Sequence, residues 1–446
     1  MPAEDSELHE CRRAATKPPA GWHLRRSSVS RLVAMVMVVL LAGAACSSGK
    51  ADESRPEPST DERDTGTAVS ATNDCRPSVG EDSELAGQIV GIAESYLADN
   101  DLRSVILSVT RGDENLVTAV MGESIDGVPA ETSMRFYNGA VVFSYLGTAM
   151  LALAEDGEFD IDAPIDTWVE GVPGGDEITP RMLMASMSGL VDFVTMESWI
   201  EELYENPFTP FTTDELEALV FAEPLAFEPG TNVAYSHLGF RLAGEVLEAA
   251  TGRPLPELLD ELVVEPLGLD ATEFTETVQF DGPVLRTYTD ERGVYEESTG
   301  WSPDWGVPAG ATQVTNICDL VRSAAGIGSG ELLGPEAMET LLTPGDADLG
   351  TPTDQCPQCI PTDDTLHLGM GVTVAGDWVI QTPLFTGIAA VQAYLPPADP
   401  DGEGLAIAVA NTYGPSGDVG VNGSTAIMAQ IAELLAPASP LPPQIG

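Results

Sequence analysis

The sequence predicts an α+β protein in which one antiparallel sheet is flanked by helices and carries an inserted, mostly helical subdomain. Strand patterns stand at both ends of the folded region, and helical patterns fill much of residues 180–300 between them. A further observation is the run 141–153, which is apolar nearly all round and therefore belongs inside a protein rather than on its surface. These features favour a sheet domain built around one buried helix.

Residues 1–46 have the pattern of a targeting segment. Arg25-Arg26 supply positive charge, residues 32–45 are apolar, and small residues directly precede Cys46. A cysteine in this place resembles a bacterial lipobox, which implies lipidation at Cys46 and an exported, membrane-anchored protein at the outer face of the cytoplasmic membrane or elsewhere in the cell envelope. An ordinary signal peptide, an uncleaved anchor and a twin-arginine signal are the alternatives.

The composition changes sharply after this segment. Residues 47–80 are rich in Ser, Thr, Asp, Glu and Pro, and they hold too little apolar surface to offset the entropy of ordering, so we expect an acidic, disordered tether. We expect one folded domain at residues 81–436, without internal repeats, and a loose Pro-rich tail at residues 437–446.

The charge of the chain is strongly one-sided, with 71 acidic against 19 basic residues and a formal net charge of -52. Such a charge repels nucleic acid and anionic headgroups, so we expect no nucleic-acid partner and membrane contact only through the lipid. Both lysines, Lys17 and Lys50, precede the folded domain. The domain therefore contains no amine side chain.

Four cysteines follow Cys46 in the expected exported part: Cys75, Cys318, Cys356 and Cys359. An even number of cysteines in an oxidising compartment predicts disulfides, with three pairings open. Cys356, Cys359 and His367 could alternatively hold a metal, but a single CxxC without a matched second pair is weak evidence for zinc. We favour disulfides and expect neither a metal nor a cofactor.

Apolar periodicity and turn residues give the order of the elements in the folded region. Helices are predicted at 83–97, at 141–157, and then at 214–220, 238–250, 255–263 and 423–435. Strands are predicted at 104–109 and 116–120 near the start, and at 368–374, 378–381, 389–394 and 405–410 near the end.

Five short segments, in chain order, carry a resemblance to a known family. They are Ile178–Leu190, Phe227–Gly230, Tyr235–Gly244, Glu265–Leu269 and Pro308–Leu320. Together they resemble the serine β-lactamases of the class C type with their penicillin-binding and D,D-peptidase relatives, a group of β-lactamase-related serine hydrolases. The resemblance spans roughly residues 85–436 and implies the β-lactamase/transpeptidase-like fold.

The first motif of this family, Ser-x-x-Lys, supplies an attacking hydroxyl and, one helical turn later, the amine that takes its proton. When Gly139 is placed on the glycine before the nucleophile, Ala140 takes the serine position and Phe143 takes the lysine position. Neither side chain can perform its part of that reaction.

The other two motifs are also altered. The family's Tyr-x-Asn becomes Tyr235-Ser236-His237, and its His/Lys-Thr-Gly is placed at Gln381-Thr382-Pro383, where the proline removes a backbone donor. The resemblance therefore implies a degenerate member, a pseudoenzyme that binds a peptide, a cell-wall fragment or a partner protein.

The competing hypothesis is an active esterase, D,D-carboxypeptidase or β-lactamase-like enzyme with a non-standard site around Tyr235, His237 and Ser144. His237 can act as a base or ligand, or it can hydrogen-bond where the amide used to be. Ser144 is expected to bond back to a helix carbonyl. Arg135 and Arg181 could hold a substrate carboxylate, but we expect both to pair with acidic neighbours.

Overall fold

A computed structural model describes residues 75–275, 282–345, 349–399 and 402–445. The chain divides into two units, residues 1–33 and 34–446, and every described element lies in the second. The targeting segment, the lipidation candidate Cys46 and most of the expected tether lie outside the described residues. Among the residues described, no helix is both long and apolar enough to cross a membrane.

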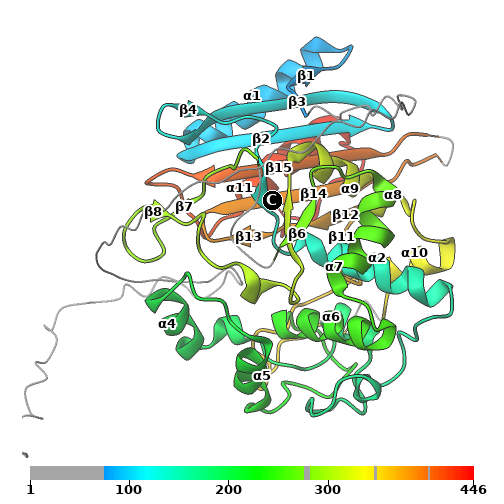
Figure 1. Cartoon of the computed structure of the whole chain (residues 1–446). Helices are drawn as coiled ribbons and strands as arrows, with labels where there is room; N and C mark the ends of the chain where they lie inside the picture. The colour runs from blue at the N-terminus through cyan, green and yellow to red at the C-terminus, as the bar shows by residue number, and fades with distance from the viewer. Residues whose placement is uncertain (1–74, 276–281, 346–348, 400–401, 446) are drawn as a thin grey trace, which may run out of the picture. The chain divides into compact units, whose positions relative to one another are not determined.

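One large antiparallel sheet forms the centre of the described unit, with strand order β1-β3-β2-β15-β14-β12-β11-β10. The N-terminal hairpin pairs with the last strand, so blue and red ribbons lie next to each other in Figure 1. The strands are β1 (Ser78–Val79), β2 (Leu102–Arg111), β3 (Glu114–Ile125), β4 (Val128–Pro129), β10 (Leu366–Leu368), β11 (Thr373–Ala375), β12 (Trp378–Gln381), β13 (Leu384–Phe385), β14 (Ile388–Leu395) and β15 (Leu405–Tyr413).

Two small sheets lie beside it, one of three strands and one of two. Their strands are β5 (Phe136–Tyr137), β6 (Glu273–Thr275) and β9 (Thr312–Thr315), and β7 (Tyr288–Thr289) with β8 (Glu296–Glu297).

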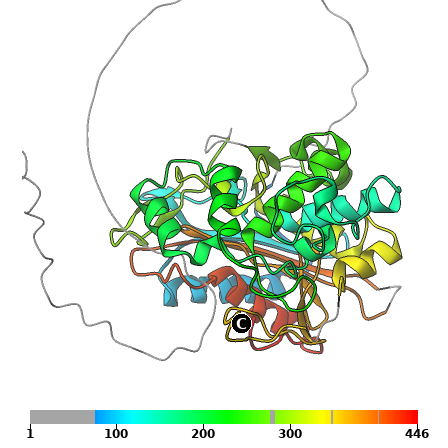
Figure 2. The same cartoon turned by 90° about the horizontal axis from the view of Figure 1, so that it is seen from below.

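Helices cover both faces of the large sheet, as Figure 2 shows with the sheet seen nearly edge-on. One face packs against α1 (Ser83–Asp99) and α11 (Gly423–Leu435), and the other against α9 (Ile317–Ser329) and the layer that contains α2 (Val141–Glu155). The remaining helices are α3 (Pro180–Met184), α4 (Glu197–Glu205), α5 (Thr213–Phe221), α6 (His237–Thr251), α7 (Leu255–Leu259), α8 (Glu265–Leu267) and α10 (Pro335–Leu342).

The central strands are buried on both faces, and their alternating side chains divide between two apolar clusters. On β2, Leu107 and Val109 face α1 and α11, whereas Ile106 joins the cluster around α2 and α9. On β15 the second face carries alanines such as Ala408, whose small side chains leave room for a helix against the sheet. The predicted α+β architecture, with its helical part between the two groups of strands, is confirmed.

Helix α2 is the buried scaffold that the sequence predicts, because nearly all of its residues are inaccessible to solvent. Gly147 lets the β10–β11 turn reach it: a β carbon there would lie 2.0 Å from the carbonyl oxygen of Met370. Only a glycine permits this close approach. The β10–β11 turn thereby contacts the helix at the level of its second turn.

Two disulfides, Cys75–Cys318 and Cys356–Cys359, confirm the disulfide prediction and give the pairing. The cysteines considered for a metal site are thus oxidised to disulfides, and the described residues contain no group of three His, Cys, Asp or Glu placed to hold a metal ion.

Three local expectations were wrong. Residues 75–80, assigned to the tether, belong to the folded unit through Cys75 and β1, which pairs with β3. Residues 437–445 are not loose: the Trp378 indole donates to the Ser439 carbonyl at 2.9 Å, and Leu441 and Ile445 pack on the α1 and α11 cluster. The single strand expected at 368–374 is two strands, because Gly369 and Gly371 form the turn between β10 and β11.

Candidate functional site

The structure brings the three predicted motif positions together. One cavity is lined by Gly139 and Ala140, which directly precede α2. His237 at the start of α6 and Phe385 of β13 line the same cavity. A β carbon on Gly139 would lie 3.2 Å from Pro383, so the third motif position also borders this point. The cavity is small, about 50 Å³.

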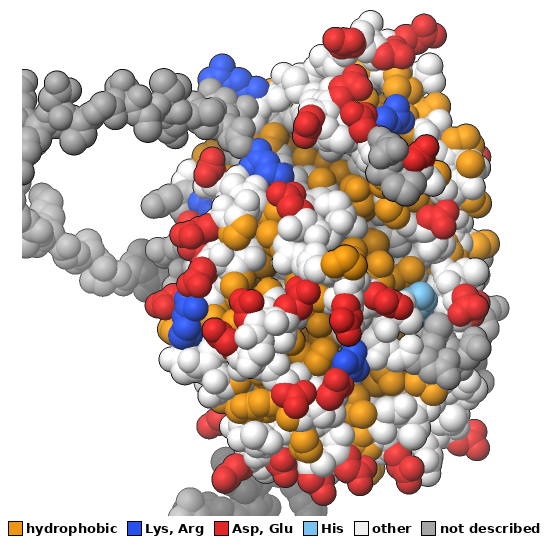
Figure 3. Space-filling model, turned by 90° about the vertical axis from the view of Figure 1, so that its right-hand side faces the viewer, with side chains coloured by type: hydrophobic (Ala, Val, Ile, Leu, Met, Phe, Trp, Pro, Cys, Tyr) orange, Lys and Arg blue, Asp and Glu red, His pale blue; other side chains and the backbone are white. Residues whose placement is uncertain are grey.

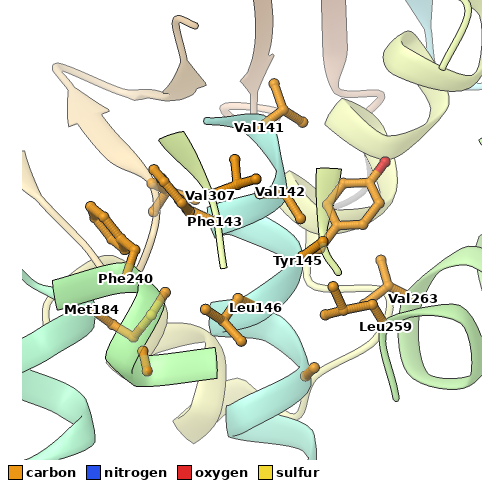
Figure 4. Close-up of a cluster of buried hydrophobic side chains, with 14 of the residues drawn as sticks. Val141, Val142, Phe143, Tyr145, Leu146, Met184, Phe240, Leu259, Val263 and Val307 are labelled. Atoms are coloured by element: carbon orange, nitrogen blue, oxygen red, sulfur yellow. The ribbon is translucent and has the colours of Figure 1, made fainter. Parts of the chain in front are cut away.

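Ala140 and Phe143 occupy the positions that the resemblance assigns to nucleophile and base. Ala140 caps α2 with no side-chain hydrogen bond and presents its methyl group to the cavity. Phe143 is fully buried, and its ring stacks on Phe240 of α6 with centroids 3.9 Å apart and planes within 9° (Figure 4). An aromatic stack therefore fills the place where that assignment requires an amine.

His237 is held by a carboxylate that the sequence analysis did not identify. Its Nδ1 lies 3.0 Å and 3.1 Å from the two carboxylate oxygens of Asp192, and its backbone N–H donates to the same group at 3.3 Å. Asp192 accepts the Nδ1 proton, so in the neutral ring Nε2 is an acceptor with no partner among the described residues. Nothing in the sequence distinguishes Asp192 from the other acidic residues except its position two residues after the Ser188–Leu190 match.

Tyr235 packs edge-on against His237, with ring centroids 5.1 Å apart, and lies within the same aromatic group as Phe143 and Phe240. Burial raises the pKa of Tyr235 well above its ordinary value, and the nearby carboxylate of Asp192 raises it further. The phenol is therefore protonated at neutral pH and cannot serve as a proton acceptor.

Aromatic rings form part of the cavity wall. Trp305 lies between His237 and Phe385, with centroid distances of 5.8 Å and 5.6 Å, and Tyr137 completes the aromatic lining. The lining contains no Arg, Lys, Asp or Glu. The other lining residues are Gly139, Ala140, Pro303, Gly306, Val307, Thr312, Gln313 and Leu384.

Two residues of the third motif, Gln381 and Thr382, do not contribute their side chains to the cavity. Gln381 is buried and donates from Nε2 to the Gly371 carbonyl at 2.6 Å. Thr382 is not among the lining residues, and its carbonyl accepts from Asn422 at 3.2 Å. Both positions therefore support the turn and strand edge beside the cavity.

The candidate Ser144 and the motif residue Ser236 both form hydrogen bonds in the structure. Ser144 is fully buried, donates to the Val141 carbonyl at 2.7 Å and accepts from the Gln392 amide at 3.0 Å, as predicted for a hydroxyl that bonds back to its helix. Ser236 caps α6 by accepting from the Gly239 N–H. Neither hydroxyl lines the cavity.

Both candidate arginines pair with acidic neighbours, as expected. Arg135 lies 2.8 Å from Glu273, and Arg181 forms a two-pronged contact with Asp162 at 2.6 Å and 2.7 Å. The His367 nitrogens face the backbone carbonyls of Asp363 and Leu342. None of these residues reaches the cavity.

Comparison with known proteins agrees with the fold. The family model described as Beta-lactamase matches residues 89–424. The chain is similar to Esterase EstB of Burkholderia gladioli, with 28% identity over 206 residues (42% of this chain, 51% of the esterase), and to a D-aminopeptidase of Cereibacter sphaeroides, with 30% identity over 135 residues (29% of this chain, 26% of the aminopeptidase).

The chain thus spans about half or less of the length of these curated relatives. A solved structure of the D-amino acid amidase from Ochrobactrum anthropi SV3 matches with a TM-score of 0.64 at 21% identity, covering 80% of this chain and 99% of the amidase chain. At that identity the match shows the fold alone.

Proposed function

The chain belongs to the beta-lactamase family of serine hydrolases, and on that premise we propose that it is a member that binds a ligand without forming an acyl-enzyme. The proposed ligand is a peptide, a cell-wall fragment or a partner protein. The observation that carries the proposal is the stack of Phe143 on Phe240, which occupies the position of the expected base behind the methyl group of Ala140.

Among the described residues around the cavity, none supplies both the missing hydroxyl and the missing base. Acylation needs a hydroxyl and a nearby base, and removing such groups from serine enzymes leaves roughly 10³ to 10⁴ of the acceleration. Ser144 is bonded to Val141 and Gln392, and Tyr235 holds its proton. Lysine is absent after Lys50 in the sequence.

The test is covalent labelling of the purified full chain with a fluorescent penicillin, read by gel fluorescence and intact mass. We expect no adduct, whereas an active penicillin-binding protein in a parallel reaction gives one. An Ala140→Ser variant should also remain unlabelled, because Phe143 still replaces the base. A stoichiometric adduct on the unmodified chain would show that acyl-enzyme chemistry survives.

We also propose that the protein is exported and anchored by lipid at Cys46, a proposal supported by the small residues before this cysteine. The test is metabolic labelling with a fatty-acid analogue in a bacterial host, followed by membrane fractionation. The wild type should carry the label and sediment with membranes, and Cys46→Ala should lose both properties. Equal label in the two proteins would exclude Cys46 as the lipidated residue.

A second candidate function is hydrolysis by an activated water, favoured specifically by the Asp192–His237 pair. In that reaction water attacks an ester carbonyl, its proton passes to His237 Nε2, and the alkoxide leaves with that proton as the alcohol. Turnover of a p-nitrophenyl ester that His237→Gln abolishes, while Ser144→Ala retains it, would support this function and displace the first.

A further inference from the structure

The cavity beside α2 lacks the basic side chains that a site for a carboxylate ligand would offer. Its lining residues include no arginine or lysine, and the chain carries 71 acidic residues against 19 basic ones. On the face shown in Figure 3, acidic side chains are spread over the surface and basic ones are few. The field of such a surface repels anions and concentrates cations near a cavity mouth.

The walls of the cavity offer two kinds of contact to a cation. The rings of Tyr137, Trp305 and Phe385 present aromatic surface, and a cation within about 6 Å of a ring centroid gains roughly 0.5 to 2 kcal/mol. His237 turns Nδ1 to Asp192, so the opposite edge of the ring, with the acceptor Nε2, is left for a ligand. The carboxyl group of Asp192 lies on the far side of this ring from the open edge.

The volume limits what can enter. A space of about 50 Å³ is far below the roughly 300 to 1,000 Å³ of ordinary small-molecule pockets, so it favours a small head group over a ring. The rest of the ligand has to extend through the opening as a slim chain.

We propose that this cavity receives a primary ammonium group at the end of a slim chain, with its N–H directed to His237 Nε2 and its charge against Trp305. The inference rests on the proposed function, because it names the ligand class of the same site. A lysine side chain and a free amino terminus of a peptide share this chemistry.

The experiment measures binding of three probes of equal length to the full chain by calorimetry: n-butylammonium, 1-butanol and butanoate. We expect butylammonium to bind at least about tenfold more tightly than butanol, and butanoate to show no saturable binding. Equal affinity for the ammonium and the alcohol, tighter binding of butanoate, or binding of none of the three would overturn the proposal.

Two variants separate the cavity from general attraction to an acidic surface. Trp305→Leu removes the ring face and Asp192→Asn removes the buried carboxylate, and each should weaken the binding of butylammonium at least about fivefold. Phe208→Leu is the control and should leave this binding unchanged, because Phe208 is 61% exposed and lies outside the lining. Circular dichroism and thermal unfolding establish that each variant is folded. Unchanged binding in a folded Trp305→Leu protein would show that the ammonium binds elsewhere.

Two further probes distinguish the sources of the amine. Nα-acetyl-lysine methylamide carries it on a side chain, and alanine methylamide carries it at the chain end. Tighter binding of the lysine derivative identifies a side-chain amine, and tighter binding of the alanine derivative identifies an amino terminus. Failure of these probes leaves the penicillin test untouched, because that test reads covalent labelling and not affinity.

Discussion

Phe143 shows how one residue changes the character of a site. It lies one helical turn after Ala140, faces α6, and is fully buried in contact with Phe240. The resulting aromatic cluster, which also includes Tyr235, stabilises the contact between α2 and α6 instead of supplying a proton acceptor.

Truncating this side chain should therefore affect stability strongly. We expect Phe143→Ala to lower the free energy of unfolding by about 3 to 5 kcal/mol, because it removes buried apolar surface and leaves a cavity. Denaturant unfolding measures the change. Phe208→Ala, at a ring that is 61% exposed, is the matched control and should change it by less than about 0.5 kcal/mol. A small effect at Phe143 would mean that the stack is not tightly packed.

Glu291 gives a prediction about pH. Its carboxyl group is buried, one oxygen has no partner among the described residues, and burial raises its pKa to about 7. Between the ordinary pKa of about 4.5 and about 7, the folded protein keeps a proton that the unfolded chain has lost, so the free energy of unfolding falls as pH rises through this window.

Glu291→Gln removes this dependence. The variant should exceed the wild type by about 3 kcal/mol in the free energy of unfolding at pH values above about 7, and the difference should vanish below about pH 4.5. Chemical denaturation across pH measures it, with Glu81→Gln at an exposed position as the control. A constant difference at every pH would exclude titration of Glu291 as the cause.

At the scale of elements, Arg241 connects helix α6 to the wall of the cavity. It is buried and donates from Nη1 to the carbonyls of Asp304 and Val307, at 2.5 Å and 2.7 Å, and from Nη2 to Thr213 of α5. Trp305 and Val307 line the cavity, so this guanidinium determines where one of its walls stands.

Arg241→Met keeps the apolar stem and removes the donors. We expect a loss of about 3 kcal/mol in the free energy of unfolding, since buried carbonyls lose their charged partner, together with weaker butylammonium binding. Denaturation and calorimetry measure the two effects. Arg253→Met is the control, because Arg253 pairs with Glu261 at an exposed surface. Full retention of butylammonium binding in Arg241→Met would show that Trp305 and Val307 keep their positions without the Arg241 hydrogen bonds.

Strong local patterns were sufficient to predict much of the fold. The predicted helix 423–435 coincides with α11, and the apolar run after Gly139 is α2. Contacts between distant residues could not be predicted this way. Asp192 acquires its role only because the fold places it beside His237, which lies 45 residues later in the sequence. The tail beyond residue 436 is ordered by contacts with Trp378 and with the α1 and α11 cluster, and the composition of the tail does not reveal these contacts.

At the scale of the whole molecule, the Cys75–Cys318 disulfide closes a loop with a sequence separation of 243 residues. In the chain-entropy model, a disulfide that closes such a loop stabilises the folded state by about 5 kcal/mol, whereas Cys356–Cys359, with its separation of 3, stabilises it by about 2 kcal/mol. We expect the pair Cys75→Ala/Cys318→Ala to lower the unfolding midpoint more than Cys356→Ala/Cys359→Ala. Calorimetric melting compares the two variants, and equal losses would contradict the loop-length argument.

The same bond determines how the domain would respond to mechanical load. Tension applied to the chain before Cys75 has a covalent path through the disulfide into α9, and this path bypasses the polypeptide between the bridged cysteines, with β2, β3 and α2. For a protein held at its amino-terminal end, the Cys75–Cys318 disulfide would keep an applied force from separating the first strands from the sheet.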